Sequence, residues 1–220
     1  MRHGYTNSTE RVPSGVRKSY VGPDALARAD AELTALTRLA RLMPVPAVVD
    51  RHADGSIVTE FRPGEHGQDL IEEGHAHQVL ASCGVLLRRL HALDPGRLLP
   101  GPHPSTHVVL HGDFGPNNIL LDSDCYTVSA LLDWEFSAIG PAIRDIAWCE
   151  WIVRMHHPTD KESLTAFFEA YGKRPSWEAR QRAMIDRCRW LEAFAHRWDA
   201  HGERARQWRQ RINDTSAWTE

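Results

Sequence analysis

The chain has 220 residues, of which 42% are hydrophobic and 25% charged, a composition that excludes a chain disordered throughout. Its formal net charge of −3 gives no overall attraction to nucleic acid or to anionic membranes. The sequence has no apolar run of the roughly 18 residues that span a bilayer. Its first residues, MRHGYTNSTERV, lack the apolar core of a signal peptide. We therefore expect a cytoplasmic protein that folds as one large domain or two lobes.

The first 61 residues predict a small antiparallel sheet that carries one helix. Turn signals at Pro13-Ser14-Gly15 and Ala53-Asp54-Gly55 each separate two short β-rich segments. Between the two pairs, apolar residues recur at helical spacing after Gly22-Pro23-Asp24 and stop at Pro44. We expect strands over residues 9–12, 16–20, 45–50 and 56–61, and the helix over residues 26–43.

The sequence RPGEHG at residues 62–67 interrupts these patterns and is the expected hinge. Beyond it the chain becomes mainly helical, with a few short strands. Helices are expected over residues 78–93, 142–155, 160–172 and 177–212, and strands over 108–110, 119–121 and 127–132. The predicted fold class is α+β, with a small β-rich lobe at 1–61, a linker at 62–67 and a larger helical lobe at 68–220.

The stretch HGDFGPNN at residues 111–118 follows the apolar strand over 108–110. Gly112, Gly115 and Pro116 disfavour a regular element, so the chain must form a loop directly after the strand. Asp113 and Asn118 on this loop suit a substrate hydroxyl and a hard cation, because Mg²⁺ prefers oxygen ligands. The spacing H-x-D-x-x-x-x-N is that of the protein-kinase catalytic loop.

A second apolar run, ALLD, places Asp133 at the end of a buried strand. Protein kinases have a metal-binding aspartate at the equivalent point, although the residues that follow here are Trp134 and Glu135. An acid in this position can also be a turn former or a helix cap. The neighbouring Asp113 loop favours a metal ligand.

A lysine on the second strand is the candidate phosphate ligand in the small lobe. Val16 and Lys18 share one face of that strand, because side chains alternate along it. Glu32, on the following helix, is the candidate ion-pair partner of Lys18, as in the lysine–glutamate pair of kinases. Arg17 is a rival for the same role.

On these residues the chain resembles the aminoglycoside phosphotransferase and choline kinase-like family, relatives of protein kinases that phosphorylate hydroxyl groups of small molecules. The most specific parts of the resemblance are HGDFGPNNILL and LLDWEFSAIGPAIRDIAW. The resemblance covers nearly the whole chain and implies a bilobal, protein-kinase-like fold. It implies binding of ATP and Mg²⁺ and a small-molecule hydroxyl as the acceptor.

The resemblance also implies a role for each matching residue. Asp113 would be the catalytic base or hydroxyl-orienting group, and Asn118 and Asp133 would bind Mg²⁺. His111 would brace the loop, and Asp145 would accept hydrogen bonds from the loop backbone, both as structural support. The residues implied on the nucleotide side are the phosphate-side turn with Gly4 and Asn7, the Lys18–Glu32 pair, and the adenine hinge Glu60, Phe61 and Arg62.

Two alternatives to a kinase remain. A nucleotide-binding pseudokinase or regulatory module would keep the fold without turnover. Basic and aromatic residues also interleave after residue 177, a pattern that can bind nucleic acid. Core packing and solvated arginines explain that segment better, because its apolar residues recur at helical spacing.

The acceptor itself stays open between aminoglycosides, sugars, macrolides, choline-like alcohols and amino alcohols. A polycationic aminoglycoside would require an acidic pocket. The acids that could line one are Glu135, Glu150, Asp160, Glu162 and Glu169.

Overall fold

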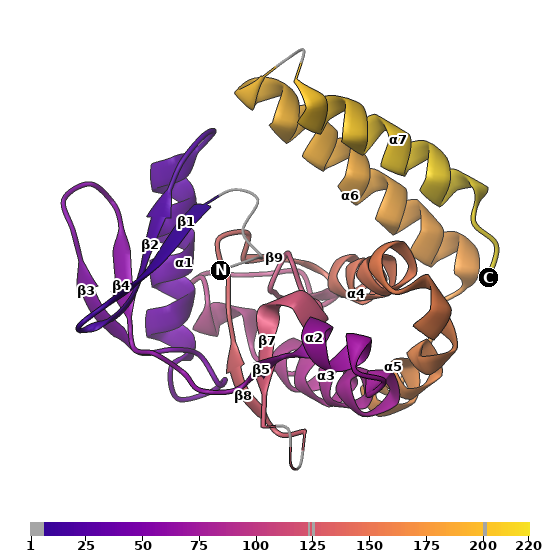
Figure 1. The fold of residues 1–220 in the computed structure, drawn as a ribbon, viewed down its shortest axis with the longest axis horizontal. Coiled ribbons are helices and arrows are strands. Elements are labelled where there is room, and N and C mark those ends of the chain that lie inside the picture. The colour runs from indigo at the N-terminus through magenta and orange to yellow at the C-terminus, as the bar shows by residue number, and fades with distance from the viewer. Residues whose placement is uncertain (1–6, 123, 125, 200–201) are drawn as a thin grey trace.

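A computed structural model of the chain describes residues 7–122, 124, 126–199 and 202–220. Its amino-terminal part contains a four-stranded antiparallel sheet with strand order β1-β2-β4-β3, at the left of Figure 1. The strands are β1 (Asn7–Val12), β2 (Gly15–Tyr20), β3 (Val48–Arg51) and β4 (Ile57–Thr59). All four predicted strands are present. The third begins later than predicted, because Pro44 and Pro46 have no N–H to donate to a sheet.

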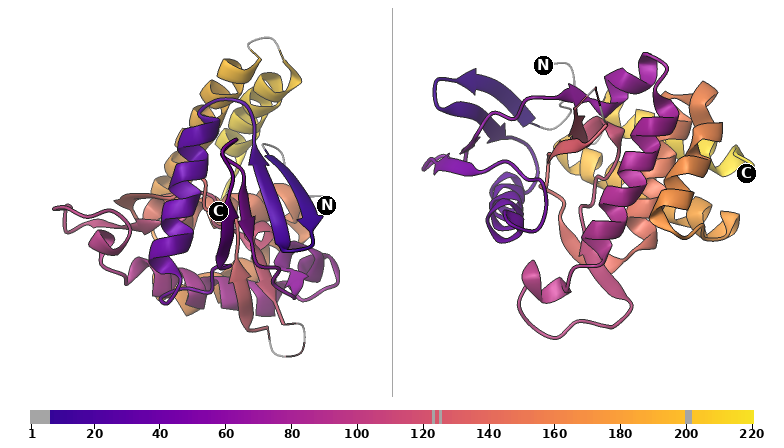
Figure 2. Two further views of the ribbon diagram at one scale, coloured as in Figure 1. Left: turned by 90° about the vertical axis from the view of Figure 1, so that its left-hand side faces the viewer. Right: turned by 90° about the horizontal axis from the view of Figure 1, so that it is seen from below.

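Helix α1 (Ala25–Leu39) packs beside this sheet, as the two views of Figure 2 show. The prediction extended it to Met43, but the helix ends at Leu39, whose carbonyl accepts from the N–H groups of both Leu42 and Met43 in a closing turn. Two charged side chains, Arg28 and Glu32, are buried on the same helix together with its apolar residues. Buried charges require partners, so each of these two residues must be paired with a group of opposite charge.

The remainder of the chain is mainly helical, which confirms the predicted α+β class with a small sheet and a larger helical part. A single cluster of buried apolar side chains extends from α1 into this remainder and includes Leu39, Leu87 and Phe167. The two parts therefore share one core. The helices of the remainder are α2 (Gly67–Glu72), α3 (Ala76–His91), α4 (Ile143–His156), α5 (Leu164–Tyr171), α6 (Trp177–Trp198) and α7 (Glu203–Ala217), with short 3₁₀ turns at Pro95–Arg97, Pro116–Asn118 and Pro158–Ser163.

Two small antiparallel sheets hold the loops of the helical part. Their strands are β5 (Glu65–His66), β7 (Ile119–Leu121) and β8 (Val128–Leu131) in one sheet, and β6 (His107–Leu110) and β9 (Ala138–Pro141) in the other. The prediction missed β5, β9 and α2, which are too short to show a clear period. Strand β5 lies inside the predicted hinge and pairs Glu65 with Leu121, so this part of the segment is attached to the larger part.

The prediction of one helix over residues 177–212 is wrong, because α6 and α7 form a hairpin that crosses the top of Figure 1. Trp208 and Ile212 of α7 pack against the cluster that contains Met184 and Cys188 of α6. A single straight helix would leave these apolar faces exposed. Within the described residues, every helix is too short or too polar to cross a membrane.

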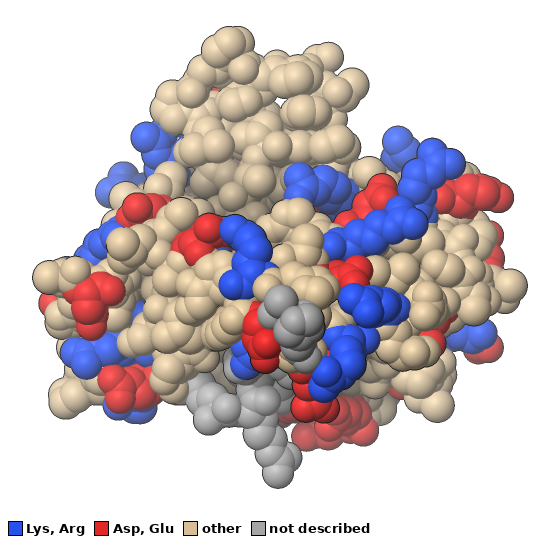
Figure 3. Space-filling view, turned by 90° about the horizontal axis from the view of Figure 1, so that it is seen from above, with Lys and Arg blue, Asp and Glu red and all other residues tan. Residues whose placement is uncertain are grey.

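We expected the arginines of the hairpin to be solvated, but not all of them are. Figure 3 shows positive and negative side chains intermixed on the face seen from above. Arg180, however, is fully buried, and its Nη1 lies 2.6 Å from Glu150 Oε1. Arg187 is also turned inward and has buried guanidinium nitrogens. Helical periodicity does not distinguish such an inward arginine from a solvated one.

Candidate active site

The turn after strand β6 carries the predicted catalytic aspartate. Strand β6 ends at Leu110, and Gly112 follows with a φ of 83°, a left-handed value that disfavours a side chain. A Cβ atom on Gly112 would lie 2.1 Å from the Phe136 carbonyl oxygen, so the space also requires glycine. The chain therefore leaves the strand abruptly and presents Asp113 on a tightly fixed turn.

The carboxylate of Asp145, at the start of α4, holds this turn from behind. It accepts from the His111 N–H at 2.8 Å (Oδ2) and from the Gly112 N–H at 2.9 Å (Oδ1). Burial alone would raise the pKa of Asp145, but the hydrogen bonds from His91 and from the Gly112 N–H hold it below its usual value. The hydrogen bonds expected between Asp145 and the loop backbone are thus present.

The buried ring of His111 joins the two predicted motifs. Its Nε2 donates to the Leu132 carbonyl at 2.8 Å, and its Nδ1 accepts from the Asp113 N–H at 3.3 Å. Burial lowers the pKa of His111, which favours the neutral ring that this donor and acceptor pattern requires. A second link is the Leu132 N–H, which donates to the Asn118 carbonyl at 2.8 Å. The Asp113 loop and the Asp133 strand end are therefore fixed to each other.

The side chain of Asp113 has two neutral donors. Trp148 Nε1 donates to Oδ1 at 2.6 Å, and Asn118 Nδ2 donates to Oδ2 at 2.8 Å and to the Asp113 carbonyl at 2.7 Å. Burial and the negative charge of Asp133 raise the pKa of Asp113 to about 6, against the opposing effects of Arg187 and of these hydrogen bonds. A carboxylate with a raised pKa is a better proton acceptor than an ordinary one.

Asp133 follows strand β8 with a φ of 65°, an uncommon backbone conformation for a residue with a side chain. Its Oδ1 lies 2.5 Å from Lys18 Nζ, across the space between the sheet and the helical part. Non-glycine residues in such conformations cluster at active sites, where the surrounding structure holds them in place. The backbone conformation and the contact with Lys18 both mark Asp133 as part of a site.

Lys18 also contacts Glu32, the partner that the sequence predicted, at 2.6 Å from Nζ to Oε2. The Tyr20 hydroxyl donates to the same Glu32 oxygen at 2.7 Å. Although burial alone would lower the pKa of Lys18, the carboxylates of Asp133 and Glu32 raise it, so the ammonium stays charged. The rival Arg17 pairs instead with the exposed Glu10 at 3.4 Å.

A second charged group joins the two parts of the molecule and was not predicted. Arg28 Nη1 lies 2.5 Å from Glu135 Oε2, and both side chains are buried. Asn7 takes part in the same group, because its Nδ2 donates to Glu135 Oε2 at 2.8 Å and its Oδ1 accepts from Arg28 at 3.2 Å. The sequence contains one indication that these charges are buried, because Arg28 and Glu32 lie one turn apart on a helix whose apolar residues recur at helical spacing. Gly4 lies outside the described residues.

A cavity of about 290 Å³ lies between the sheet and the helical part. Lys18, Glu32 and Asp133 line its polar side. The predicted hinge residues Glu60, Phe61 and Arg62 also line it, with Arg62 Nε 2.7 Å from Glu60 Oε1. The rest of the wall is largely apolar and includes Val16, Leu36, Ile57, Leu120 and Leu132. We name this space the sheet-side cavity.

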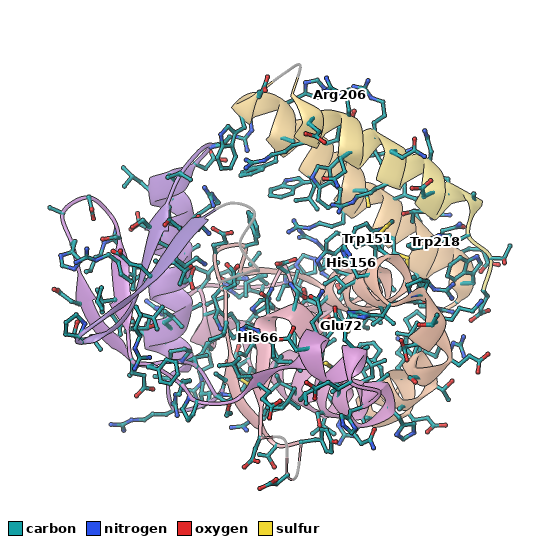
Figure 4. All side chains as sticks on the ribbon, viewed as in Figure 1. His66, Glu72, Trp151, His156, Arg206 and Trp218 are labelled. Atoms are coloured by element: carbon teal, nitrogen blue, oxygen red, sulfur yellow. The ribbon has the colours of Figure 1, made fainter. Side chains whose placement is uncertain are left out.

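A second cavity of about 220 Å³ lies on the other side of the two loops, beneath the helix hairpin. Asp113 lines this cavity only, whereas Asn117, Asn118 and Asp133 line both cavities. Figure 4 labels Trp151 and His156 of α4, which line this second cavity below α6 and α7. We name this space the hairpin-side cavity. The two cavities meet at the side chains of Asn118 and Asp133. Lys18 lines the sheet-side cavity, and Asp113 lines the hairpin-side cavity.

Comparisons with known proteins bear on the family and the fold of the chain. The family model of the phosphotransferase enzyme family matches residues 3–107 and 96–208. No curated protein matches the chain by sequence. Among solved structures, the GDP complex of aminoglycoside 2'-phosphotransferase-IIIa has a TM-score of 0.76 at 12% identity, over 99% of this chain and 91% of that chain.

Two further solved structures share the fold. A thermostable mutant of aminoglycoside phosphotransferase APH(4)-Ia, in a ternary complex with AMP-PNP and hygromycin B, has a TM-score of 0.71 at 13% identity, over 100% of this chain and 93% of that chain. A choline/ethanolamine kinase family protein from Mesorhizobium loti has a TM-score of 0.66 at 15% identity, over 97% and 85%. The predicted kinase-like fold is therefore confirmed. Because the family model spans most of the sequence, this chain belongs to the phosphotransferase enzyme family.

Proposed function

We propose that the protein transfers the γ-phosphate of ATP to a hydroxyl group of a small molecule. The observation that carries this proposal is the meeting of the two cavities at Asn118 and Asp133, with Lys18 and Asp113 on opposite sides. The sheet-side cavity would hold the nucleotide and the hairpin-side cavity the acceptor. The lobes at 1–61 and 68–220 and the linker at 62–67 remain our proposed domain division.

The sheet-side cavity has the features that a nucleotide requires. Its apolar wall suits a base, and Glu60, Phe61 and Arg62, whose backbone would meet the adenine, line the cavity. Lys18 is protonated, and two of its three ammonium hydrogens face carboxylates, which leaves one for a phosphate oxygen. Asn7 borders the same cavity.

Asp113 would act on the acceptor. Its carboxylate orients the hydroxyl and takes its proton as the hydroxyl oxygen attacks the γ-phosphorus. The bond from that phosphorus to the bridging oxygen breaks, and ADP leaves with the bond's electrons. Trp148 and Asn118 fix the carboxylate, so little reorganisation is needed during the reaction.

Asn118 and Asp133 fit a magnesium ion. Both amide hydrogens of Asn118 are donated to Asp113, so the amide oxygen is the atom left for a cation. The Asp133 carboxylate supplies a second oxygen, and Mg²⁺ typically takes one or two protein oxygens together with water and substrate phosphates. When bound, Mg²⁺ would supply positive charge that offsets the negative charge of the nucleotide phosphates.

A pseudokinase would keep the same fold and bind nucleotide without transfer. The hydrogen bonds and ion pairs of Asp113, Asn118 and Asp133 support the enzyme, because they hold side chains of the kinds that the transfer requires. The test is a screen of hydroxyl-bearing compounds with ATP and Mg²⁺, read by mass spectrometry for acceptors that gain one phosphoryl group, with D133N as the control. We expect at least one phosphorylated acceptor with the wild type and about 100-fold less product with D133N. Nucleotide binding without any phosphorylated product would favour the pseudokinase.

A further inference from the structure

The hairpin-side cavity offers little to a polycation. Three acids line it, and each already has a partner: Asp113 with Trp148 and Asn118, Asp133 with Lys18, and Glu135 with Arg28. Lys18 and Arg28 offset the charges of Asp133 and Glu135, and Trp148 and Asn118 occupy the oxygens of Asp113 with hydrogen bonds. The residues outside the described part of the chain include no Asp or Glu.

The other acids considered for a cationic acceptor lie elsewhere. Glu150 is buried against Arg180 and Arg154, with distances of 2.6 Å and 2.9 Å. The described residues that line the hairpin-side cavity do not include Glu150, Asp160, Glu162 or Glu169. Of the five candidate acids, only Glu135 faces the cavity.

Three arginines of the hairpin line the same cavity: Arg187, Arg204 and Arg211. The positive charge of Arg187 acts on Asp113 and opposes the rise in the pKa of that carboxyl. Burial lowers the pKa of Arg187 to about 10, with Asp113 opposing, so the guanidinium is still protonated at neutral pH. The cavity therefore has a positive wall beside the catalytic carboxylate.

The guanidinium of Arg187 has unused hydrogen-bonding capacity. Its Nε and Nη2 are buried, and neither has a hydrogen-bond partner in the part of the chain that the structure describes. The group stacks on aromatic rings instead, 4.3 Å from the Trp190 centroid and 5.1 Å from that of Phe136. A buried donor without an acceptor is costly, and a guanidinium fork matches carboxylate and phosphate oxygens. The unpaired nitrogens therefore indicate an oxyanion from a ligand.

Much of the remaining wall is aromatic. The rings of Trp148 and Trp151 stack with centroids 4.4 Å apart, and Trp208 lies 5.6 Å from Trp151. Such a wall suits a ring or another flat apolar face. At about 220 Å³ the cavity is also smaller than the roughly 300–1,000 Å³ typical of sites for drug-sized ligands. A compact acceptor fits this space better than a large oligosaccharide.

We propose that the acceptor is a compact, ring-bearing alcohol that carries an oxyanion, and that Arg187 binds this oxyanion. A carboxylate and a phosphate monoester share the required chemistry. The inference rests on the proposed function, because it takes the hairpin-side cavity as the acceptor site. It excludes polycationic aminoglycosides as good substrates of this chain.

The test measures binding, so it does not depend on turnover. The probes are 4-(hydroxymethyl)benzoate, 4-(hydroxymethyl)phenyl phosphate, 4-(hydroxymethyl)benzylamine and kanamycin, titrated by calorimetry into the whole protein with Mg²⁺ and a non-hydrolysable ATP analogue. We expect at least one anionic probe to bind about tenfold or more tightly than the amine and kanamycin. The two anionic probes distinguish carboxylate from phosphate recognition.

Two variants assign the effect to Arg187. R187M should lose the preference for the anion, and R189M, which changes an exposed arginine of the same helix, should keep it. If R187M does not fold, R187K keeps the charge without the planar fork and should weaken anion binding about tenfold. Tighter binding of the amine or kanamycin, no binding of either anion at millimolar concentration, or an unchanged preference in the folded Arg187 variant would overturn the proposal. Failure of the phosphotransferase proposal would appear separately, as an acceptor screen without product.

Discussion

Replacing Asp145 by alanine tests whether this buried carboxylate holds the turn that carries Asp113. Asp145 is 1% exposed, and it accepts from the backbone N–H groups of His111 and Gly112 and from His91 at 3.3 Å. D145A leaves two backbone donors next to Asp113 without their acceptor. An unsatisfied buried donor costs about 1–3 kcal/mol, so we expect the free energy of unfolding to fall by about 4 kcal/mol.

The assay is urea unfolding followed by tryptophan fluorescence, with D186A as the control. Asp186 is an exposed acid on α6 that pairs only weakly with Arg189, at 3.4 Å, and its loss should change the unfolding free energy by less than about 0.5 kcal/mol. D145A should also lower kcat, because its loss frees the turn that carries Asp113. A D145A protein as stable as D186A would refute the role of Asp145 in holding the turn.

The same carboxylate predicts a pH dependence of stability. Its pKa in the folded protein lies below the usual value of 3.8, so its ionised form is favoured by folding. Its contribution is therefore fully present above pH 3.8 and is lost as the pH falls through the lower, folded value. The difference in unfolding free energy between wild type and D145N should be constant near neutral pH and should shrink below about pH 4. A difference that grows on acidification would contradict this sign.

Three further substitutions test the rest of the site. G112A should lower the unfolding free energy by about 3 kcal/mol in the same urea assay and abolish transfer, because a Cβ clashes with the backbone at this turn; a stable, active G112A would show that the turn is adaptable. K18M should lower the free energy of unfolding by about 3 kcal/mol and weaken ATP binding in calorimetry, because Lys18 compensates the buried charge of Glu32. The double variant K18M/E32Q should recover stability but not ATP binding. Additive losses of stability in the double variant would argue against the Lys18–Glu32 ion pair. W148F removes a hydrogen bond that lowers the pKa of Asp113, so the acid limb of the pH profile of kcat/KM should move to higher pH. An acid limb that does not move would show that Trp148 does not affect the proton transfer to Asp113.

The parts of the site that are local in sequence could be predicted. Asp113 and Asn118 lie in one loop, and glycine and proline show where the strand must end. Strand alternation put Lys18 on the same face as Val16, and the analogy with the lysine–glutamate pair of kinases put Glu32 on the following helix as its partner. The structure brings these residues together at hydrogen-bonding distances.

The parts that depend on tertiary contacts could not be predicted. Arg28 and Glu135 are 107 positions apart, and no local pattern relates them. The break between α6 and α7 was missed because both halves have helical periodicity, and only their mutual packing requires a turn. The inward position of Arg187 follows from that same packing, so the charge of the hairpin-side cavity could not be read from the sequence.

We propose that Asp113 acts on the acceptor hydroxyl in the hairpin-side cavity, whereas the nucleotide binds in the sheet-side cavity. The most direct test compares D113N with the wild type in two measurements, the Kd for ATP with Mg²⁺ and the kcat for a phosphorylated acceptor. We predict that the Kd changes by less than about threefold, while kcat falls by about 100-fold or more. A D113N enzyme that transfers phosphate at nearly the wild-type rate would contradict the assignment of the catalytic residue.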